Sequence, residues 1–167
     1  KTGLSNGRFQ TTAFNGRTIF VNGAEQFSWD GSSASDISLT LSDSSSQGTI
    51  KGVHAHKNRV YYFRGTDQKF YYSATVDTFA GNFTVFDLSV VADKGGNIVS
   101  MGTVTIDGGE GVDDLLAIIL ASGQVLIYSG SNPSSGFSLI GTFRIAEPIN
   151  EPRCIAKFGG DIAVSTK

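Results

Sequence analysis

Short apolar runs separated by glycine-rich polar turns recur along the whole chain. One motif, a polar turn followed by a strand-like run, occurs in four related forms: NGRTIFVNG at 15–23, KNRVYYFRGT at 57–66, DDLLAIILASGQVLIYSG at 113–130 and GGDIAVST at 159–166. In the first three, a second turn and a second strand-like run follow. Apolar runs of about four to eight residues bounded by Gly, Asn and Asp are typical of β-strands. The pattern predicts a chain built from repeated β-hairpins.

The turn residues place these hairpins. The first is predicted to run from Thr18–Asn22 to Gln26–Trp29 through Asn22-Gly23, a dipeptide that suits a two-residue turn because both central positions need a positive φ. Three further hairpins are predicted to join 59–64 to 69–73, 115–121 to 124–129, and 154–158 to 162–165, and 137–145 is predicted as one more strand.

No helix is predicted, because no stretch of eleven or more residues has an apolar stripe at helical spacing. Asp113–Leu120 also fits a short helix. Its β-branched Ile118 and Ile119, and the Ser122-Gly123 turn that follows, favour a buried strand instead.

The spacing of the hairpins predicts a repetitive architecture. Their first residues are separated by 42 residues (Arg17 to Arg59), 55 residues (Arg59 to Asp114) and 47 residues (Asp114 to Asp161). Blades of a β-propeller, each with four antiparallel strands, occupy about 40–50 residues. The fold class predicted is therefore all-β, a propeller-like array of antiparallel blades with about three blades and part of a fourth.

We expect one such domain over residues 1–167. A closed propeller usually needs at least four blades. Either the chain is a fragment whose ring is completed by sequence outside it, or the architecture is open. The alternative fold is an irregular β-sandwich, whose hairpins resemble one another because hairpin turns in general favour Gly, Asn and Asp.

Composition narrows the function classes. Charged residues make up 17% of the chain, below the roughly 25% usual in globular domains, which favours a surface partly covered by neighbouring molecules. The net charge of −2 gives no basic footprint for nucleic acid. The longest apolar run, Leu115–Ala121, is too short for a membrane helix. One cysteine, Cys154, excludes an internal disulfide and is expected to be a small buried residue.

Two clusters could bind metal. His54 and His56 alternate along a predicted strand and would share a face, but no third ligand follows at a suitable spacing, which favours a structural strand face. Asp107–Asp114 carries four carboxylates in eight residues on a glycine-rich loop; calcium binding and a solvated loop are the alternatives, and its spacing does not match an EF-hand. We therefore predict no metal and no cofactor.

No catalytic motif is present. The chain lacks G-x-S-x-G, H-E-x-x-H and a P-loop, and the turn Ser28-Trp29-Asp30-Gly31 has the wrong residue order for the repeated turn of sialidase-type propellers. A glycosidase would have to use carboxylates such as Glu110 and Asp114. We predict that the protein is not an enzyme and has no catalytic residues.

Aromatic and arginine side chains offer binding alternatives. Phe27 and Trp29, with the pairs Tyr61-Tyr62 and Tyr71-Tyr72, could form a sugar-stacking platform, although one tyrosine of each pair should face the core. Arg17 and Arg59 begin equivalent strands and either line a channel for anions or brace one hairpin on the next by bonding to loop carbonyls. The second interpretation is the simpler one.

The motifs together resemble a known group of proteins. F-N-G-R-x-I-F-V-N-G with its Trp-Asp-Gly turn, H-K-N-R-V-Y-Y-F-R-G-T, G-Q-V-L-I-Y-S-G-S-N-P, F-S-L-I-G-T-F-R-I and F-G-G-D-I-A-V-S-T are similar to β-propeller-containing virion proteins of tailed bacteriophages, of the tail-nozzle or tail-hub kind. The resemblance covers residues 14–166 and carries over no catalytic residue.

This resemblance implies a structural component of the virion, located in the tail or neck. It implies ring-shaped homo-oligomers, commonly hexamers, that contact other tail or neck proteins and let the genome leave without specific DNA binding or membrane contact. The alternative function is a carbohydrate-binding or receptor-binding β module.

Overall fold

The computed structural model describes residues 1–107 and 112–167, which form two compact units. The first unit contains Lys1–Gly65 and Lys69–Phe86, and the second contains Thr66–Gln68 and Asp87–Lys167. The described residues form β-strands without an α-helix, and one short 3-10 turn, η1 (Gln47–Thr49), is present. The all-β prediction is therefore confirmed. None of the sheets closes on itself in the described part of the chain. The expectation of a single domain over 1–167 stays a prediction.

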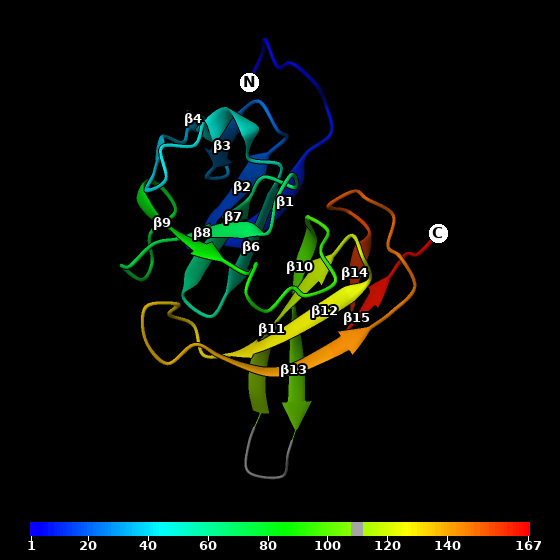
Figure 1. Cartoon of the computed structure of the whole chain (residues 1–167). Coiled ribbons are helices and arrows are strands. Elements are labelled where there is room, and N and C mark those ends of the chain that lie inside the picture. Colours follow the sequence, from blue (N-terminus) through cyan, green and yellow to red (C-terminus); the bar gives the residue numbers. More distant parts are fainter. Residues whose placement is uncertain (108–111) are drawn as a thin grey trace. The chain divides into compact units, whose positions relative to one another are not determined.

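The first sheet is a four-stranded antiparallel meander (Figure 1). Its strands are β1 (Gln10–Phe14), β2 (Arg17–Val21), β3 (Gln26–Trp29) and β4 (Ala34–Asp36). The tight turn lies at Asn15-Gly16, where both φ angles are positive (48° and 70°). Positive φ at both central positions is the geometry that matches the twist of two paired strands.

The predicted two-residue turn at Asn22-Gly23 is wrong. Four residues, 22–25, separate β2 from β3. The side chain of Asn22 explains the longer loop, because its Oδ1 accepts hydrogen bonds from the backbone N–H groups of Ala24 (2.9 Å) and Glu25 (2.7 Å). An Asn side chain that bonds the backbone two or three residues ahead replaces the turn's own backbone bonds.

The second sheet of the first unit has the order β5-β9-β8-β7-β6. These strands are β5 (Leu39–Leu41), β6 (Gly52–His56), β7 (Arg59–Phe63), β8 (Lys69–Tyr72) and β9 (Gly81–Asp87). β6 to β9 form a second meander, and β5 joins its outer edge in parallel with β9. The predicted hairpin between 59–64 and 69–73 is confirmed as β7 and β8.

One apolar core holds the two sheets of the first unit together. β1 and β2 pack against β6. The core side chains are buried, and they are Phe14, Ile19, Val21, Ile37, Leu39, Leu41, Ile50, Val53, Val60, Tyr62, Tyr71 and Phe83. Burial of this much apolar surface is the main stabilising contribution to such a unit.

The second unit repeats the meander. β10 (Ile98–Asp107), β11 (Val112–Leu120), β12 (Gln124–Ser129) and β13 (Ser138–Arg144) follow one another in an antiparallel sheet. β14 (Ile155–Phe158) and β15 (Asp161–Val164) form a separate hairpin, which packs against β10. The preference for a strand over a helix at Asp113–Leu120 is confirmed, as are the hairpins through Ser122-Gly123 and Gly159-Gly160.

Candidate functional site

The two histidines lie on β6, as expected. The described residues place no further metal ligand beside them. His56 is buried and His54 is half-buried, and in the strand register they lie opposite Arg59 and Tyr61 of β7. Among the residues that the structure describes, no group of three or more His, Cys, Asp or Glu side chains is placed to hold a metal ion. In those same residues, no helix is long and apolar enough to cross a membrane.

The acidic segment Asp107–Asp114 is only partly described. Residues 108–111, including Glu110, lie outside the described residues, and with them the calcium and glycosidase alternatives. Of the flanking carboxylates, Asp114 accepts a hydrogen bond from Thr105 Oγ1 at 2.6 Å, across the β10–β11 pair.

Cys154 is buried, as predicted, and burial raises the pKa of its thiol.

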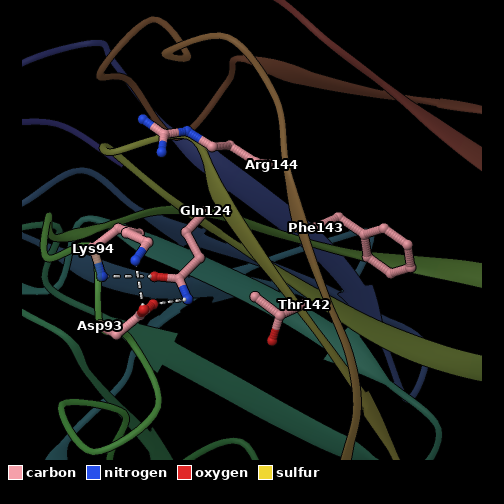
Figure 2. Close-up of a pocket in the computed structure, with 6 residues that line it drawn as sticks. All are labelled: Asp93, Lys94, Gln124, Thr142, Phe143 and Arg144. Carbon is pink, nitrogen blue, oxygen red and sulfur yellow. Dashed lines mark hydrogen bonds and ion pairs between the residues drawn. The ribbon is translucent and has the colours of Figure 1, made fainter.

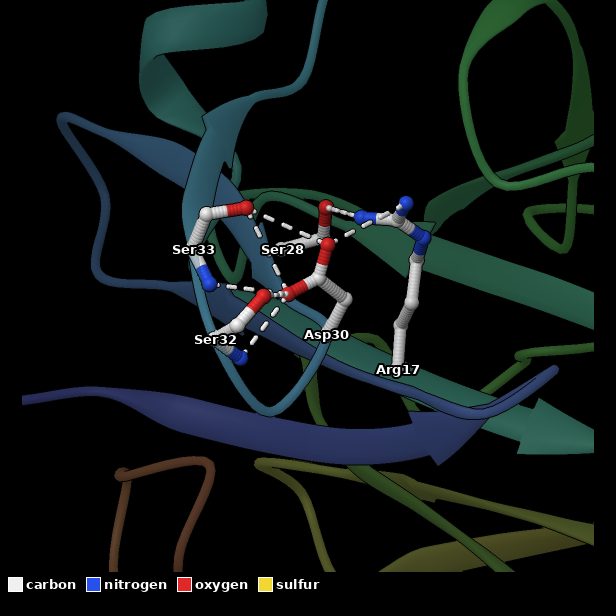
Figure 3. A network of polar contacts seen from close by, with 5 residues as sticks. All are labelled: Arg17, Ser28, Asp30, Ser32 and Ser33. Atoms are coloured by element: carbon white, nitrogen blue, oxygen red, sulfur yellow. Dashed lines mark hydrogen bonds and ion pairs between the residues drawn. The ribbon is translucent and has the colours of Figure 1, made fainter.

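Arg17 braces the first sheet by bonding to its third strand. Figure 3 shows its guanidinium beside Ser28 and Asp30, with Nη1 at 3.3 Å from Ser28 Oγ and Nη2 at 3.7 Å from Asp30 Oδ2. Asp30 in turn caps the β3–β4 turn, since its Oδ1 accepts from the backbone N–H groups of Ser32 and Ser33 (3.0 and 2.8 Å).

Arg59 occupies the equivalent position in the second sheet, where it is buried. Its Nη1 donates to the backbone carbonyl of Ser73, just after β8. Both arginines therefore connect the start of the second strand of a meander to the end of the third. The predicted bond to a loop carbonyl is present for Arg59, whereas Arg17 bonds a hydroxyl and a carboxylate instead.

The alternative of a sugar-stacking platform fails for five of its six aromatics, which are buried. Tyr61, Tyr62, Tyr71 and Tyr72 are all buried, as is Phe27, and only Trp29 is exposed. The expectation that just one tyrosine of each pair faces a core fails because β7 and most of β8 are covered on both faces. Burial accordingly raises the pKa of Tyr61 and Tyr62.

A hollow of about 200 Å³ with several polar and charged residues around it lies at the start of β12 (Figure 2). The buried amide of Gln124 fills its wall: Nε2 donates to Asp93 Oδ1 (2.9 Å) and to the carbonyl of Val91 (3.2 Å), and Oε1 accepts from the backbone N–H of Lys94 (3.2 Å). Lys94 Nζ also pairs with Asp93 at 2.7 Å. These groups bond one another, and their hydrogen bonds anchor the segment before β10 to the sheet.

An apolar groove on the second unit is the strongest candidate for a functional surface. One face of the β10–β13 sheet carries a buried cluster, and the β14–β15 hairpin packs on it through Ile155, Ile162 and Val164. The main contacts of the hairpin are with β10, and apolar side chains of β13 remain exposed. There Phe143 is 60% exposed and Ile140 is 54% exposed, and Ile106 of β10 is 52% exposed.

Two adjoining hollows make up this groove, and they share Val104, Ile127 and Phe143. The larger has a volume of about 330 Å³ and reaches Asp161 at the start of β15; the smaller, about 180 Å³, lies against Ile162 and Val164. Asp161 is the only charged residue among those lining the groove in the described chain. A concave, mainly apolar surface of this kind is typical of a binding site, either for another protein or for an apolar ligand.

This groove was not predicted from the sequence. The apolar residues of 137–145 carry no local signal that separates them from those of the buried strands. A two-stranded hairpin cannot cover a four-stranded sheet, so apolar side chains on the fourth strand stay exposed.

Comparison with known proteins found no match for this chain. No model of a known protein family matches the chain, and no curated protein has a significantly similar sequence.

Proposed function

We propose that this chain is a structural component of a bacteriophage virion, part of the tail or neck, which acts by assembling with copies of itself and with neighbouring tail proteins. The hairpin motifs described above suggest the class of protein. The observation that carries the proposal is the apolar groove between β13 and β15, lined by Phe143 and Ile127, because it suits a protein surface better than a small polar substrate.

We also propose that the sheets are blades of a propeller-like array. Support comes from the way successive sheets meet inside each unit. β1, the first strand of its meander, packs against β6, the first strand of the next. β10 packs against both strands of the following hairpin, more on β15 than on β14. Contact between the first strands of successive sheets is expected when blades radiate from a central channel.

The proposed role is mechanical. Strands covered on both faces, such as β7, make rigid blades, and rigid blades can hold a ring-shaped conduit or platform. A ring of such chains, with a hexamer as the expected form, would let the genome pass without holding it. The net charge of −2 fits this role, because tight DNA binding needs many Lys and Arg side chains to neutralise phosphates.

Negative-stain electron microscopy of the purified protein tests the assembly, and mass spectrometry of purified phage particles tests the location. We expect rings with a central hole and the presence of the chain in particles. A protein that remains monomeric at micromolar concentration and is absent from particles would overturn the proposal.

The carbohydrate-binding alternative is tested in the same preparation. Trp29 is the only tryptophan and is exposed, so its fluorescence reports on any sugar stacked against it. We expect no change on adding cell-surface polysaccharide of the host. Saturable quenching would favour a receptor-binding module.

A further inference from the structure

The first unit contains three Asn-Gly dipeptides, which the fold holds in very different ways. They are Asn6-Gly7, Asn15-Gly16 and Asn22-Gly23. Asparagine before glycine is prone to deamidation, because glycine has no side chain to keep its backbone nitrogen away from the asparagine side chain. Since all three sites share the same dipeptide, a difference in their rates in the folded protein must come from the structure around them.

The reaction consumes only water. The backbone nitrogen of the glycine forms a bond to Cγ of the preceding asparagine, and the bond from Cγ to the side-chain nitrogen breaks. Ammonia leaves with the proton of the glycine amide, and a cyclic imide remains. Water then opens the imide at one of its two carbonyl groups, which gives aspartate or isoaspartate. No group is oxidised or reduced.

The peptide between Asn22 and Gly23 is held at both ends. For the attack, the peptide unit must rotate so that its nitrogen approaches the asparagine side chain, and hydrogen bonds to that unit oppose the rotation. The N–H of Gly23 donates to the carbonyl of Ile50 (2.8 Å), and the carbonyl of Asn22 accepts from Nδ2 of Asn6 (3.4 Å). The turn bonds described above also hold the Asn22 side chain, and the residue is buried.

The peptide between Asn6 and Gly7 is held at one end. The carbonyl of Asn6 accepts from Nδ2 of Asn22 at 3.2 Å. In the described residues the N–H of Gly7 makes no hydrogen bond. The Oδ1 atom of Asn6 accepts from the backbone N–H of Arg8 at 2.9 Å, which restrains the side chain. One backbone bond and one side-chain bond therefore oppose the attack at this site.

The peptide between Asn15 and Gly16 is held at neither end. Both residues are exposed at the β1–β2 turn, and within the described chain neither the N–H nor the carbonyl of this peptide makes a hydrogen bond. Hairpin turns of types I′ and II′ both have a positive φ at the first central residue and differ in the orientation of this peptide. Glycine at the second position allows either orientation. The nitrogen of Gly16 can thus turn towards the Asn15 side chain while Phe14 and Arg17 stay paired.

We propose that Asn15 is a site of spontaneous deamidation in the folded protein and that the fold protects Asn22 from the same reaction. The inference is independent of the assembly role proposed above. Nδ2 of Asn15 donates to the carbonyl of Asp77 (3.2 Å), and the N–H of Asp77 donates to the carbonyl of Asn58 in the β6–β7 turn (2.9 Å). Because a carboxylate has no donor, deamidation detaches the β1–β2 turn from this bridge.

Peptide mapping by mass spectrometry measures the three rates in the whole 167-residue chain. The chain is aged in mildly alkaline buffer, folded and, in parallel, unfolded in urea, and the ratio of the two rates removes any effect of local sequence. We expect folding to slow Asn22 by more than about a hundredfold, because several hydrogen bonds must open first, and Asn15 by less than about tenfold. The ratio for Asn6 should fall between them.

Two further measurements identify the chemical route and the site. Labelling with an isoaspartyl methyltransferase should detect isoaspartate at position 15, which direct hydrolysis of the side-chain amide does not produce. The folded Asn15→Asp chain, as the matched control, should lose most of the ammonia that the natural folded chain releases. Equal protection of Asn15 and Asn22, or aspartate without isoaspartate at position 15, would overturn the inference.

Discussion

Val125 and Phe143 lie opposite each other on neighbouring strands, yet one is buried and the other is not. Their register places them on the same face of the sheet, and Val125 is 8% exposed whereas Phe143 is 60% exposed. Val125 belongs to the cluster against which the β14–β15 hairpin packs, and Phe143 does not. A difference in cover over the distance of one strand therefore separates a core residue from a residue of the groove.

This difference predicts unequal costs for two substitutions. Val125→Ala should lower the free energy of unfolding by about 2 kcal/mol, because it removes buried methyl groups. Phe143→Ser should change it by less than about 1 kcal/mol, since the ring is already largely in water. Urea unfolding followed by circular dichroism measures both. A cost for Phe143→Ser as large as that for Val125→Ala would mean that the ring is covered in solution.

Gly52 is a second sensitive position, because a ring lies across its backbone. Gly52 is paired with Phe63 on the neighbouring strand, and a Cβ atom at position 52 would overlap the Phe63 ring. Phe63 is fully buried and cannot move aside easily. Gly52→Ala should therefore lower the free energy of unfolding by about 1–3 kcal/mol.

Gly7→Ala is the matched control for Gly52→Ala. A Cβ at position 7 would have no neighbour within 4 Å, and its backbone has no positive φ. The change should shift the unfolding free energy by less than about 1 kcal/mol. Equal effects of the two substitutions, measured by thermal unfolding, would rule out the close packing of Phe63 on Gly52.

The two equivalent arginines should differ in their importance for stability. Arg59 is buried and donates to the carbonyl of Ser73, so Arg59→Ala leaves that acceptor without its bond and should cost about 2–3 kcal/mol. Arg17 is half-exposed in its ion pair with Asp30, and Arg17→Ala should cost less than about 1 kcal/mol. Chemical denaturation of the two variants checks this order, and a larger loss for Arg17→Ala would contradict it.

The carboxylate of Asp30 should make the stability of the folded protein depend on pH in the acidic range. The backbone N–H groups of Ser33 and Ser32 bond its carboxylate and hold the pKa of Asp30 well below its usual value of 3.8. A lowered pKa in the folded state means that the stabilisation is fully present above the unfolded value, near pH 4, and is lost progressively as the pH falls towards the folded pKa.

The Asp30→Asn variant isolates this contribution. Its Oδ1 can still accept from both N–H groups, but it cannot ionise. The difference in stability between the natural protein and the variant should be constant from pH 7 to about pH 5 and should shrink below about pH 4. Urea midpoints measured across this range give the answer. A difference that grows on acidification would contradict the depressed pKa.

The sequence by itself determined the local structure of this protein. Short apolar runs punctuated by Gly, Asn and Asp are sufficient to specify strands and turns, and Asp113–Leu120 was placed in a strand because β-branched residues and a following Ser-Gly turn are local properties. The equivalence of Arg17 and Arg59 also followed from the motif, and both side chains bond to the end of the third strand of their sheet.

Only the tertiary structure decided which surfaces are covered. Alternation predicts two faces for a strand, but it cannot say that Tyr61 and Tyr62 would both be buried, because the second cover comes from residues distant in sequence. The parallel pairing of β5 with β9 joins residues about forty positions apart, which no local pattern encodes.

The groove beside β15 has the same physical origin. The sequence shows Ile140 and Phe143 as ordinary apolar residues of a strand, and nothing local distinguishes them from the buried Val125 and Ile127. Exposure depends on how far the packing hairpin extends across the sheet. Because burial is a property of the assembled surfaces and strand formation is a property of the local chain, the first required the folded structure and the second did not.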